Sequence, residues 1–441
     1  MQANNEIKNK IFGLVKEYYQ KFMKPTPLNN IPVSGKKFDD QELCSAVDAV
    51  LDGWWTEGEV TKRFEKKFNQ FLGIKHTLLV NSGSSANFLA LKTLTSQKLG
   101  EKRIKKGDEI ITVAAGFPTT INPIIECGCI PVFCDIEIPT YNIKIQELNN
   151  AISSKTRAIF LAHTLGNPFD LDEVKKFCLE NELWLIEDAC DALGSLYNEK
   201  YIGTYGDLGT FSFYPAHQIT MGEGGALVTN NDILIKIARS IRDWGRDCWC
   251  DTGKDNTCGK RFEWQLGDLP KGYDHKYIYS EIGYNLKNTD LNVAIGLAQL
   301  DKLQEFINLR KRNFQLLLNK LMKFEEFFYL PRNIKNSIPC WFGFPITLKP
   351  KVSFTRLELL KYLEKSKIAT RLLFAGNIIR QPYFIDYKIN HRIVKNLTNT
   401  DYIMNNTFWI GINPLVTTDN IDFIGKIFES FLTSYKKKGS N

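Results

Sequence analysis

Short apolar segments rich in β-branched and aromatic residues alternate with helix-like segments from about residue 38 to residue 300. The intervals between them mostly have room for one crossover helix each. This alternation predicts a doubly wound α/β domain with a largely parallel sheet. The predicted strands are residues 77–80, 109–114, 131–136, 157–162, 183–188, 209–213 and 225–229.

The pattern changes after about residue 300. A long, charged, amphipathic helical segment comes first, and a strand-like WFGFPITL from Trp341 and mixed α/β elements follow it. We therefore expect three parts: an N-terminal arm over 1–37, a large α/β domain over 38–305, and a small α+β domain over 306–441.

Composition narrows the class of protein. The 441 residues are 43% hydrophobic and 24% charged, which is typical of a soluble globular protein and excludes disorder. The N-terminus is polar, and no apolar run approaches the ~18 residues of a membrane span, so we expect a cytoplasmic protein without a membrane partner. The net charge, 57 − 49 = +8, is spread along the chain and calls for no nucleic acid.

Four of the ten cysteines stand out. Cys248, Cys250 and Cys258 lie within eleven residues, and Cys190 precedes Cys248 by 58 positions. In a cytosolic chain, cysteines are expected to be free thiols, metal ligands or packed core residues rather than partners in structural disulfides. Three or four thiolates suit a 2Fe-2S cluster or a tetrahedral zinc ion. The spacing alone does not decide between a cluster, a zinc ion and no metal at all.

A phosphate site is predicted where the strand 77–80 runs into the segment NSGSSAN. Gly83 permits close approach, Ser84 and Ser85 can donate hydroxyls, and the following helix directs its positive end at the turn. A Ser-rich helix cap without a ligand is the alternative.

Two further strands are predicted to end in reactive side chains at one sheet edge. Asp188 closes the strand 183–188, where a carboxylate pairs with a protonated ring nitrogen or caps the next helix. Ser212, Tyr214 and His217 follow the strand 209–213, and His217 is a candidate base ahead of a Gly-rich turn.

Four ordered motifs, NSGSSAN, EDACDALG, SFYPAH with GEGGALVTN, and GYNLKNTDLNVAIGLAQL, resemble the DegT-type sugar aminotransferase family. The resemblance implies the aspartate aminotransferase (type I) fold, a vitamin B6 cofactor and a homodimer. It also implies these roles: Asp188 pairs with the pyridine nitrogen, Gly83, Ser84, Ser85 and Ser212 hold the phosphate, Phe117 stacks on the ring, and Asn285 reaches the phosphate of the partner subunit.

One departure changes the expected reaction. Most of the family has a lysine where this chain has His217, and imidazole cannot form the covalent link to pyridoxal phosphate. This change resembles the keto-deoxysugar 3-dehydratase branch, which implies pyridoxamine phosphate and His217 as a general base near its ordinary pKa. Asp191 is expected to orient and charge-stabilise the imidazole, and Tyr214 to assist the departing hydroxyl. Local hydrogen bonding and simple packing are the alternatives for these two.

The cysteine spacing C-x57-C-x-C-x7-C resembles the iron–sulfur members of that branch. It implies a 2Fe-2S cluster on Cys190, Cys248, Cys250 and Cys258, close to the cofactor. Electrons would come from a separate NAD(P)H-dependent flavin reductase, because the chain has no flavin or nicotinamide fingerprint.

The same resemblance implies a nucleotide-linked 4-keto-6-deoxyhexose as substrate, in 3,6-dideoxysugar synthesis for lipopolysaccharide O-antigen or another surface glycan. CDP is implied by the resemblance alone, and TDP or GDP stays open. Arg371 and Arg380 are candidate diphosphate partners. A reductase-independent 3-dehydratase, a pyridoxal phosphate aminotransferase and a non-catalytic regulatory relative are the competing hypotheses.

Overall fold

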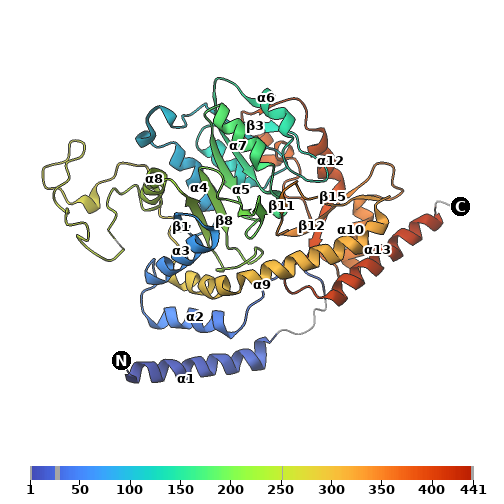
Figure 1. Ribbon diagram of the computed structural model, residues 1–441, viewed down its shortest axis with the longest axis horizontal. Coiled ribbons are helices and arrows are strands. Elements are labelled where there is room, and N and C mark those ends of the chain that lie inside the picture. Colours follow the sequence, from blue (N-terminus) through green and yellow to red (C-terminus); the bar gives the residue numbers. More distant parts are fainter. Residues whose placement is uncertain (1, 25–29, 251, 439–441) are drawn as a thin grey trace.

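The computed structural model describes residues 2–24, 30–250 and 252–438 (Figure 1). An eight-stranded sheet forms the larger part of the molecule and a four-stranded sheet the smaller part. The long helix α9 (Asp290–Leu321) runs past both parts in Figure 1. The alternating pattern and the family resemblance predicted this two-part α/β architecture, and the structure confirms it.

The large sheet is mixed. From β14 to β8 neighbouring strands are parallel, whereas β9 is antiparallel to both β8 and β1. Each of the seven predicted strands is present, with its ends shifted by at most one or two residues. In sheet order the strands are β1 (His76–Val80), β9 (Gly225–Thr229), β8 (Leu208–Ser212), β5 (Trp184–Asp188), β4 (Thr156–Ala162), β2 (Glu109–Val113), β3 (Ile130–Cys134) and β14 (Arg392–Ile393).

Helices cover both faces of this sheet, which explains why its strands read as continuous apolar runs. Leu78 and Val80 of β1 pack into the core on one face, and Leu79 packs into the core on the other. Side chains alternate across a strand, so a two-sided core needs apolar residues at every position. The surrounding helices are α3 (Glu59–Leu72), α4 (Gly83–Leu94), α5 (Pro118–Glu126), α6 (Leu148–Ala151), α7 (Leu171–Glu180) and α8 (Asp232–Arg242).

The smaller sheet is antiparallel and includes β12 (Gly343–Leu348), which comes from the predicted WFGFPITL strand. Its other strands are β10 (Phe328–Tyr329), β15 (Thr407–Gly411) and β13 (Thr370–Leu372). The accompanying helices are α10 (Arg356–Lys365), α11 (Pro382–Asp386), α12 (Thr398–Asn406) and α13 (Thr418–Lys438). The three short strands β6 (Leu196–Tyr197), β7 (Lys200–Tyr201) and β11 (Ser337–Ile338) form a third sheet.

Several connections join the larger and smaller parts. Strand β14, from the C-terminal region, adds to the large sheet beside β3. Buried Asp135 after β3 accepts hydrogen bonds from the backbone N–H groups of Asn399 (2.9 Å) and Thr400 (2.8 Å) at the start of α12. Helix α9 also runs through the expected boundary at 305/306, so the division into domains there stays a prediction.

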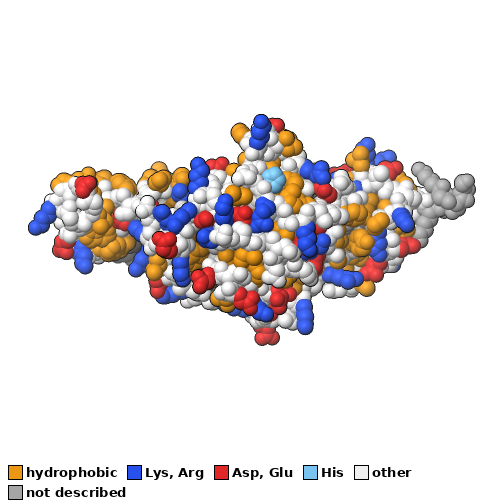
Figure 2. All heavy atoms as spheres, turned by 90° about the horizontal axis from the view of Figure 1, so that it is seen from above, with side chains coloured by type: hydrophobic (Ala, Val, Ile, Leu, Met, Phe, Trp, Pro, Cys, Tyr) orange, Lys and Arg blue, Asp and Glu red, His pale blue; other side chains and the backbone are white. Residues whose placement is uncertain are grey.

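The N-terminal region adds α2 (Asp40–Leu51) beside α9, and α1 (Gln2–Tyr18) packs against α2 (Figure 1). Within the described residues, no helix is both long and apolar enough to cross a membrane. The face shown in Figure 2 carries acidic and basic side chains interspersed, without a broad area of one sign.

Candidate active site

Asp188 lies at the carboxyl end of β5 and is buried. Its Oδ2 accepts hydrogen bonds from Asn87 Nδ2 and Thr120 Oγ1, both at 2.7 Å, and its Oδ1 accepts one from the backbone N–H of Cys190 at 3.1 Å. No helix follows Asp188 directly, so its alternative role as a helix cap does not apply. Groups from α4 and α5 thus hold the carboxylate at the sheet edge.

The start of α4 forms a tight turn against the end of β8. Ser82 caps the helix by accepting from the backbone N–H of Ser85. A Cβ added to Gly83 would lie 2.4 Å from Ser212 Cβ and 3.1 Å from Cys190 Sγ, so only glycine fits there. Exposed Ser84 stands in the same first turn. This positive helix end, with Ser84, Ser85 and Ser212 nearby, suits a phosphate.

Three predicted site residues lie at the surface of the chain. Phe117 is 52% exposed and its ring meets Phe374 edge-on, with centroids 6.0 Å apart. Tyr214 is also 52% exposed. Asn285 is exposed and its Oδ1 accepts from Lys287 Nζ at 2.8 Å. Their roles toward a cofactor ring, a substrate and a partner subunit stay predictions.

His217 faces Asp191 inside the molecule. Its Nδ1 lies 3.5 Å from Asp191 Oδ1 and makes no hydrogen bond in the described part of the chain. Burial, with a smaller contribution from Arg310, lowers the pKa of His217 to about 3. Burial and the charge of Asp188 raise the pKa of Asp191 to about 8.

These shifts differ from the ordinary pKa values that the expected roles of the pair assume, and the roles themselves stay predictions. His217 does not keep its ordinary pKa, because desolvation disfavours the imidazolium. The raised pKa of Asp191 disfavours its carboxylate form, because burial and the nearby charge of Asp188 oppose a second negative charge. Both shifts therefore favour the uncharged forms of the two side chains.

Arg310, which the sequence did not single out, and Gln218, which stands where a second histidine was expected, fix the backbone around His217. Arg310 of α9 is buried and donates to the carbonyl oxygens of Phe342 (3.0 Å) and His217 (3.2 Å). Gln218 Nε2 donates to the carbonyl of Asp191 at 2.5 Å. The available signal for Arg310 was its place in the apolar stripe of α9, on the face that also buries Phe306.

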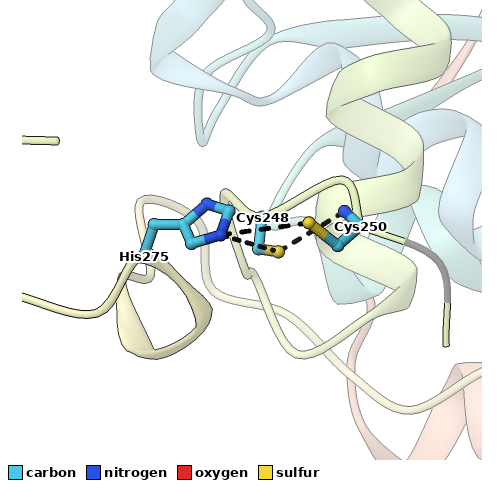
Figure 3. A group of neighbouring side chains, drawn as sticks. All are labelled: Cys248, Cys250 and His275. Atoms are coloured by element: carbon cyan, nitrogen blue, oxygen red, sulfur yellow. Dashed lines mark hydrogen bonds between the residues drawn. The ribbon is translucent and has the colours of Figure 1, made fainter. Parts of the chain in front are cut away.

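Three of the four predicted metal ligands come together with a histidine. They lie in the segment between α8 and α9, which projects from the body of the molecule (Figure 1). The ligand atoms of Cys248, Cys250 and His275 all lie within 4.8 Å of one another (Figure 3), and Cys258 Sγ lies 3.6 Å from His275 Nε2. Cys190 is absent from this group among the described residues, and its sulfur lies beside Gly83.

Local contacts set the acidity of the cysteine thiols in this group. Burial raises the pKa of Cys250, but hydrogen bonds involving Thr257 and Cys258 outweigh it and bring the pKa to about 7. Burial raises the pKa of Cys248 to about 11. Three thiols and an imidazole fit either a 2Fe-2S cluster or a tetrahedral zinc ion, so the donor set is suitable for the predicted metal centre.

The two candidate diphosphate ligands lie in the smaller part of the molecule. Arg380 binds both carboxylate oxygens of Asp401, at 2.6 and 2.7 Å. Arg371 of β13 donates to the carbonyl of Thr370. Contacts of these two arginines with a nucleotide sugar stay predictions. Arg380 could bind a diphosphate only with nitrogen atoms that it does not use for Asp401.

The large mixed sheet with a smaller antiparallel sheet beside it is the fold of the type I vitamin B6 proteins. The chain belongs to the DegT/DnrJ/EryC1/StrS aminotransferase family, whose model matches residues 37–429. It is 55% identical over 435 residues to the lipopolysaccharide biosynthesis protein RfbH of Salmonella typhimurium, covering 98% of this chain and 99% of that protein.

Other members of the family support the same placement. The chain is 47% identical over 430 residues to a dTDP-4-dehydro-2,6-dideoxy-D-glucose 3-dehydratase of Saccharopolyspora spinosa, covering 97% of this chain and 92% of that protein. The solved structure of the E. coli GDP-4-keto-6-deoxy-D-mannose-3-dehydratase with bound hydrated PLP matches with a TM-score of 0.81 and 30% identity. That match covers 90% of this chain and 99% of the other.

Proposed function

We propose that this chain is a pyridoxamine phosphate-dependent CDP-4-keto-6-deoxyglucose 3-dehydratase. The observation that carries the proposal is His217, a largely buried imidazole beside Asp191 in the place where most of the family has lysine. A histidine cannot tether the cofactor, which favours 3-dehydration over amino transfer. The relatives named as 3-dehydratases support the same class of reaction.

The site residues divide into cofactor holders and proton carriers. Pyridoxamine phosphate, when bound, supplies an amine that condenses with a keto sugar and an acidic methylene group beside it. Asp188 would pair with the ring nitrogen, and the turn at Gly83 with Ser212 would hold the phosphate. We assign ring stacking to Phe117, and contact with the partner's phosphate in a cytoplasmic homodimer to Asn285.

The neutral imidazole is the form of His217 that burial favours. As a neutral imidazole it can accept the methylene proton, whereas an imidazolium could not. Asp191, 3.5 Å away, lies where its side chain can interact with the imidazolium and stabilise it. Arg310 and Gln218 keep the two side chains facing each other through the backbone. We assign Tyr214 to the departing hydroxyl.

The cysteine-rich segment supports an electron-dependent version of the reaction. Cys248, Cys250 and Cys258 converge as a metal site requires, and their spacing resembles the iron–sulfur members of the 3-dehydratase branch. A 2Fe-2S cluster held there would supply single electrons to the reaction. We propose that the cluster receives them from a separate NAD(P)H-dependent flavin reductase. The nucleotide is proposed as CDP, and the relatives named for dTDP and GDP sugars make those nucleotides the alternatives to test.

Two measurements test this proposal. Anaerobically purified protein is assayed for iron, acid-labile sulfide and visible absorption. It is then incubated with pyridoxamine phosphate, a flavin reductase, NADH and the CDP-, dTDP- or GDP-linked 4-keto-6-deoxy sugar. We expect matched iron and sulfide, absorption that dithionite bleaches, and a CDP-sugar product lighter by one oxygen.

Other outcomes would contradict parts of the proposal. An iron-free protein that still removes the C3 oxygen without the reductase would identify a reductase-independent 3-dehydratase. A product that gains an amino group and keeps its C3 oxygen would identify an aminotransferase.

A further inference from the structure

We propose that Asn87 is a positioning residue that acts through Asp188 to keep the ring nitrogen of the bound cofactor protonated. The inference rests on the proposed function, because it concerns the vitamin B6 ring with which Asp188 is proposed to pair. It adds to that function a side chain that the sequence motifs did not single out.

The first support is the surroundings of the Asn87 side chain. Asn87 lies in α4 and is fully buried. Its neighbours Ala86, Leu89 and Ala90 in the same helix belong to an apolar core cluster. Burying an amide among apolar side chains is unfavourable unless its polar atoms find partners. An amide at this position therefore needs a specific partner, and Asp188 provides one.

The second support is the orientation of the amide group. Asn87 Nδ2 donates to Asp188 Oδ2 at 2.7 Å, and Asn87 Oδ1 accepts from the hydroxyl of Thr210 on β8 at 2.5 Å. An ionised carboxylate only accepts hydrogen bonds, whereas a threonine hydroxyl can donate one. Thr210 therefore holds Asn87 with its NH2 group directed at the carboxylate of Asp188.

The third support is the number of donors that meet the carboxylate. Asp188 Oδ2 also accepts from Thr120 Oγ1 at 2.7 Å, and Oδ1 accepts from the backbone N–H of Cys190 at 3.1 Å. Hydrogen bonds donated to a carboxylate favour its charged form. A proton shared between this carboxylate and a ring nitrogen is therefore expected to stay on the nitrogen, which gives an ion pair.

The position of this proton matters for the proposed reaction. A protonated ring withdraws electrons and makes the proton of the neighbouring methylene group acidic. Burial lowers the pKa of His217, so its imidazole is a weaker base than an ordinary histidine. A weaker base depends more strongly on the acidity of the proton that it removes. Asn87 thus supports proton transfer to His217 through Asp188 and the ring.

The test uses pyridoxamine phosphate labelled with 15N in the ring, bound to the protein at pH 7.5. The NMR shift of the ring nitrogen separates the protonated from the unprotonated ring. Asn87→Leu and Thr120→Val each remove one donor to Asp188. Thr93→Val is the matched control, because the buried hydroxyl of Thr93 lies in the same helix and donates to the carbonyl of Leu89 at 2.7 Å.

We expect the shift of a protonated ring in wild type and in Thr93→Val. In Asn87→Leu the ratio of protonated to unprotonated ring should fall about tenfold or more, as expected for the loss of one hydrogen bond to a charged group. Thr120→Val should change the shift in the same direction. The leucine side chain suits the apolar surroundings, and the hydroxyl of Thr210 can turn to the carbonyl of Glu187 at 3.4 Å.

The possible failures can be told apart. Wild-type protein that retains no pyridoxamine phosphate in equilibrium dialysis would contradict the proposed function, and this inference with it. Wild-type protein that binds the cofactor with an unprotonated ring would contradict the inference alone, as would Asn87→Leu with the wild-type shift. If circular dichroism shows that Asn87→Leu does not fold, Asn87→Ala removes the same donor without added volume and is judged by the same shift.

Discussion

At position 217, a histidine in place of lysine is expected to change the reaction without changing the fold that the family shares. In His217→Lys, the ε-amino group is expected to bond covalently to added pyridoxal phosphate, because the chain keeps the residues proposed to hold the ring and the phosphate. Borohydride reduction followed by peptide mass spectrometry should then show a pyridoxyl group on residue 217. His217→Asn is the control and should show none. A lysine variant that binds the cofactor without a covalent adduct would mean that residue 217 does not face the ring.

Asp191 gives a pH dependence whose sign follows from its raised pKa. The pKa is about 8 in the folded chain against an ordinary value of 3.8, so folding binds a proton between these pH values. The stability that this proton contributes is present below pH 3.8 and is lost as the pH rises toward 8. Each pH unit in this window costs about 1.4 kcal/mol at most.

We therefore expect Asp191→Asn to gain stability relative to wild type as the pH rises from 5 to 8. Thermal unfolding of both cofactor-free proteins at these two pH values measures the change. Asp386 in α11 is exposed, so Asp386→Asn is the control. The difference in stability between this variant and wild type should be the same at pH 5 and pH 8. A pH-independent difference for Asp191→Asn would mean that this carboxyl group is ionised in the folded protein.

At the scale of elements, α3 depends on a residue far away in the sequence. No side chain within the helix caps its start, and Asp290 at the beginning of α9 takes that role. Its carboxylate accepts from the backbone N–H groups of Gly58 (2.9 Å), Val60 (3.0 Å) and Thr61 (3.1 Å). Buried Asp290 thereby fastens two helices together.

Asp290→Ala should lower the free energy of unfolding by about 2–4 kcal/mol, because it removes a cap and leaves buried donors without partners. Chemical denaturation followed by circular dichroism measures the loss. Asp301→Ala is the matched control on the same helix, since the exposed pair of Asp301 with Lys67 should contribute less than about 1 kcal/mol. Equal effects of the two substitutions would contradict the capping role.

The cysteine-rich segment is expected to hold the proposed cluster independently of cofactor binding at the sheet edge. Replacing both Cys248 and Cys250 with serine should abolish the visible absorption of the cluster while binding of pyridoxamine phosphate persists. Cys127 and Cys129 have the same spacing outside this segment, so their double replacement should keep the absorption. Absorption spectroscopy and equilibrium dialysis measure the two properties, and joint loss of both would point to a role in folding.

Sequence patterns were informative where a signal is local. Strands buried on both faces are continuous apolar runs, and the turn at Gly83 follows directly from its strand, so both could be predicted. Contacts between distant segments had no such signal. Asp290 capping α3, Arg310 holding the carbonyl of His217, and His275 among the thiols each join residues whose proximity only the folded chain determines.

For the whole molecule, the larger and smaller parts are expected to unfold together. They share α9, the β3–β14 pairing and the Asp135 cap of α12, so separating them breaks buried hydrogen bonds. Calorimetry should show one transition, and Asp135→Ala should lower its midpoint. Two transitions in wild-type protein would support independent domains divided near residue 305.

The pairing of β3 with β14 also has a consequence for synthesis on the ribosome. Strand β3 is complete once residue 134 has emerged, but the strand that covers its outer edge ends at residue 393. Until then a nascent chain with an assembled large sheet presents an open edge, which is a template for pairing with other chains. Premature termination anywhere between these positions is therefore expected to yield aggregation-prone fragments that chaperones must shield.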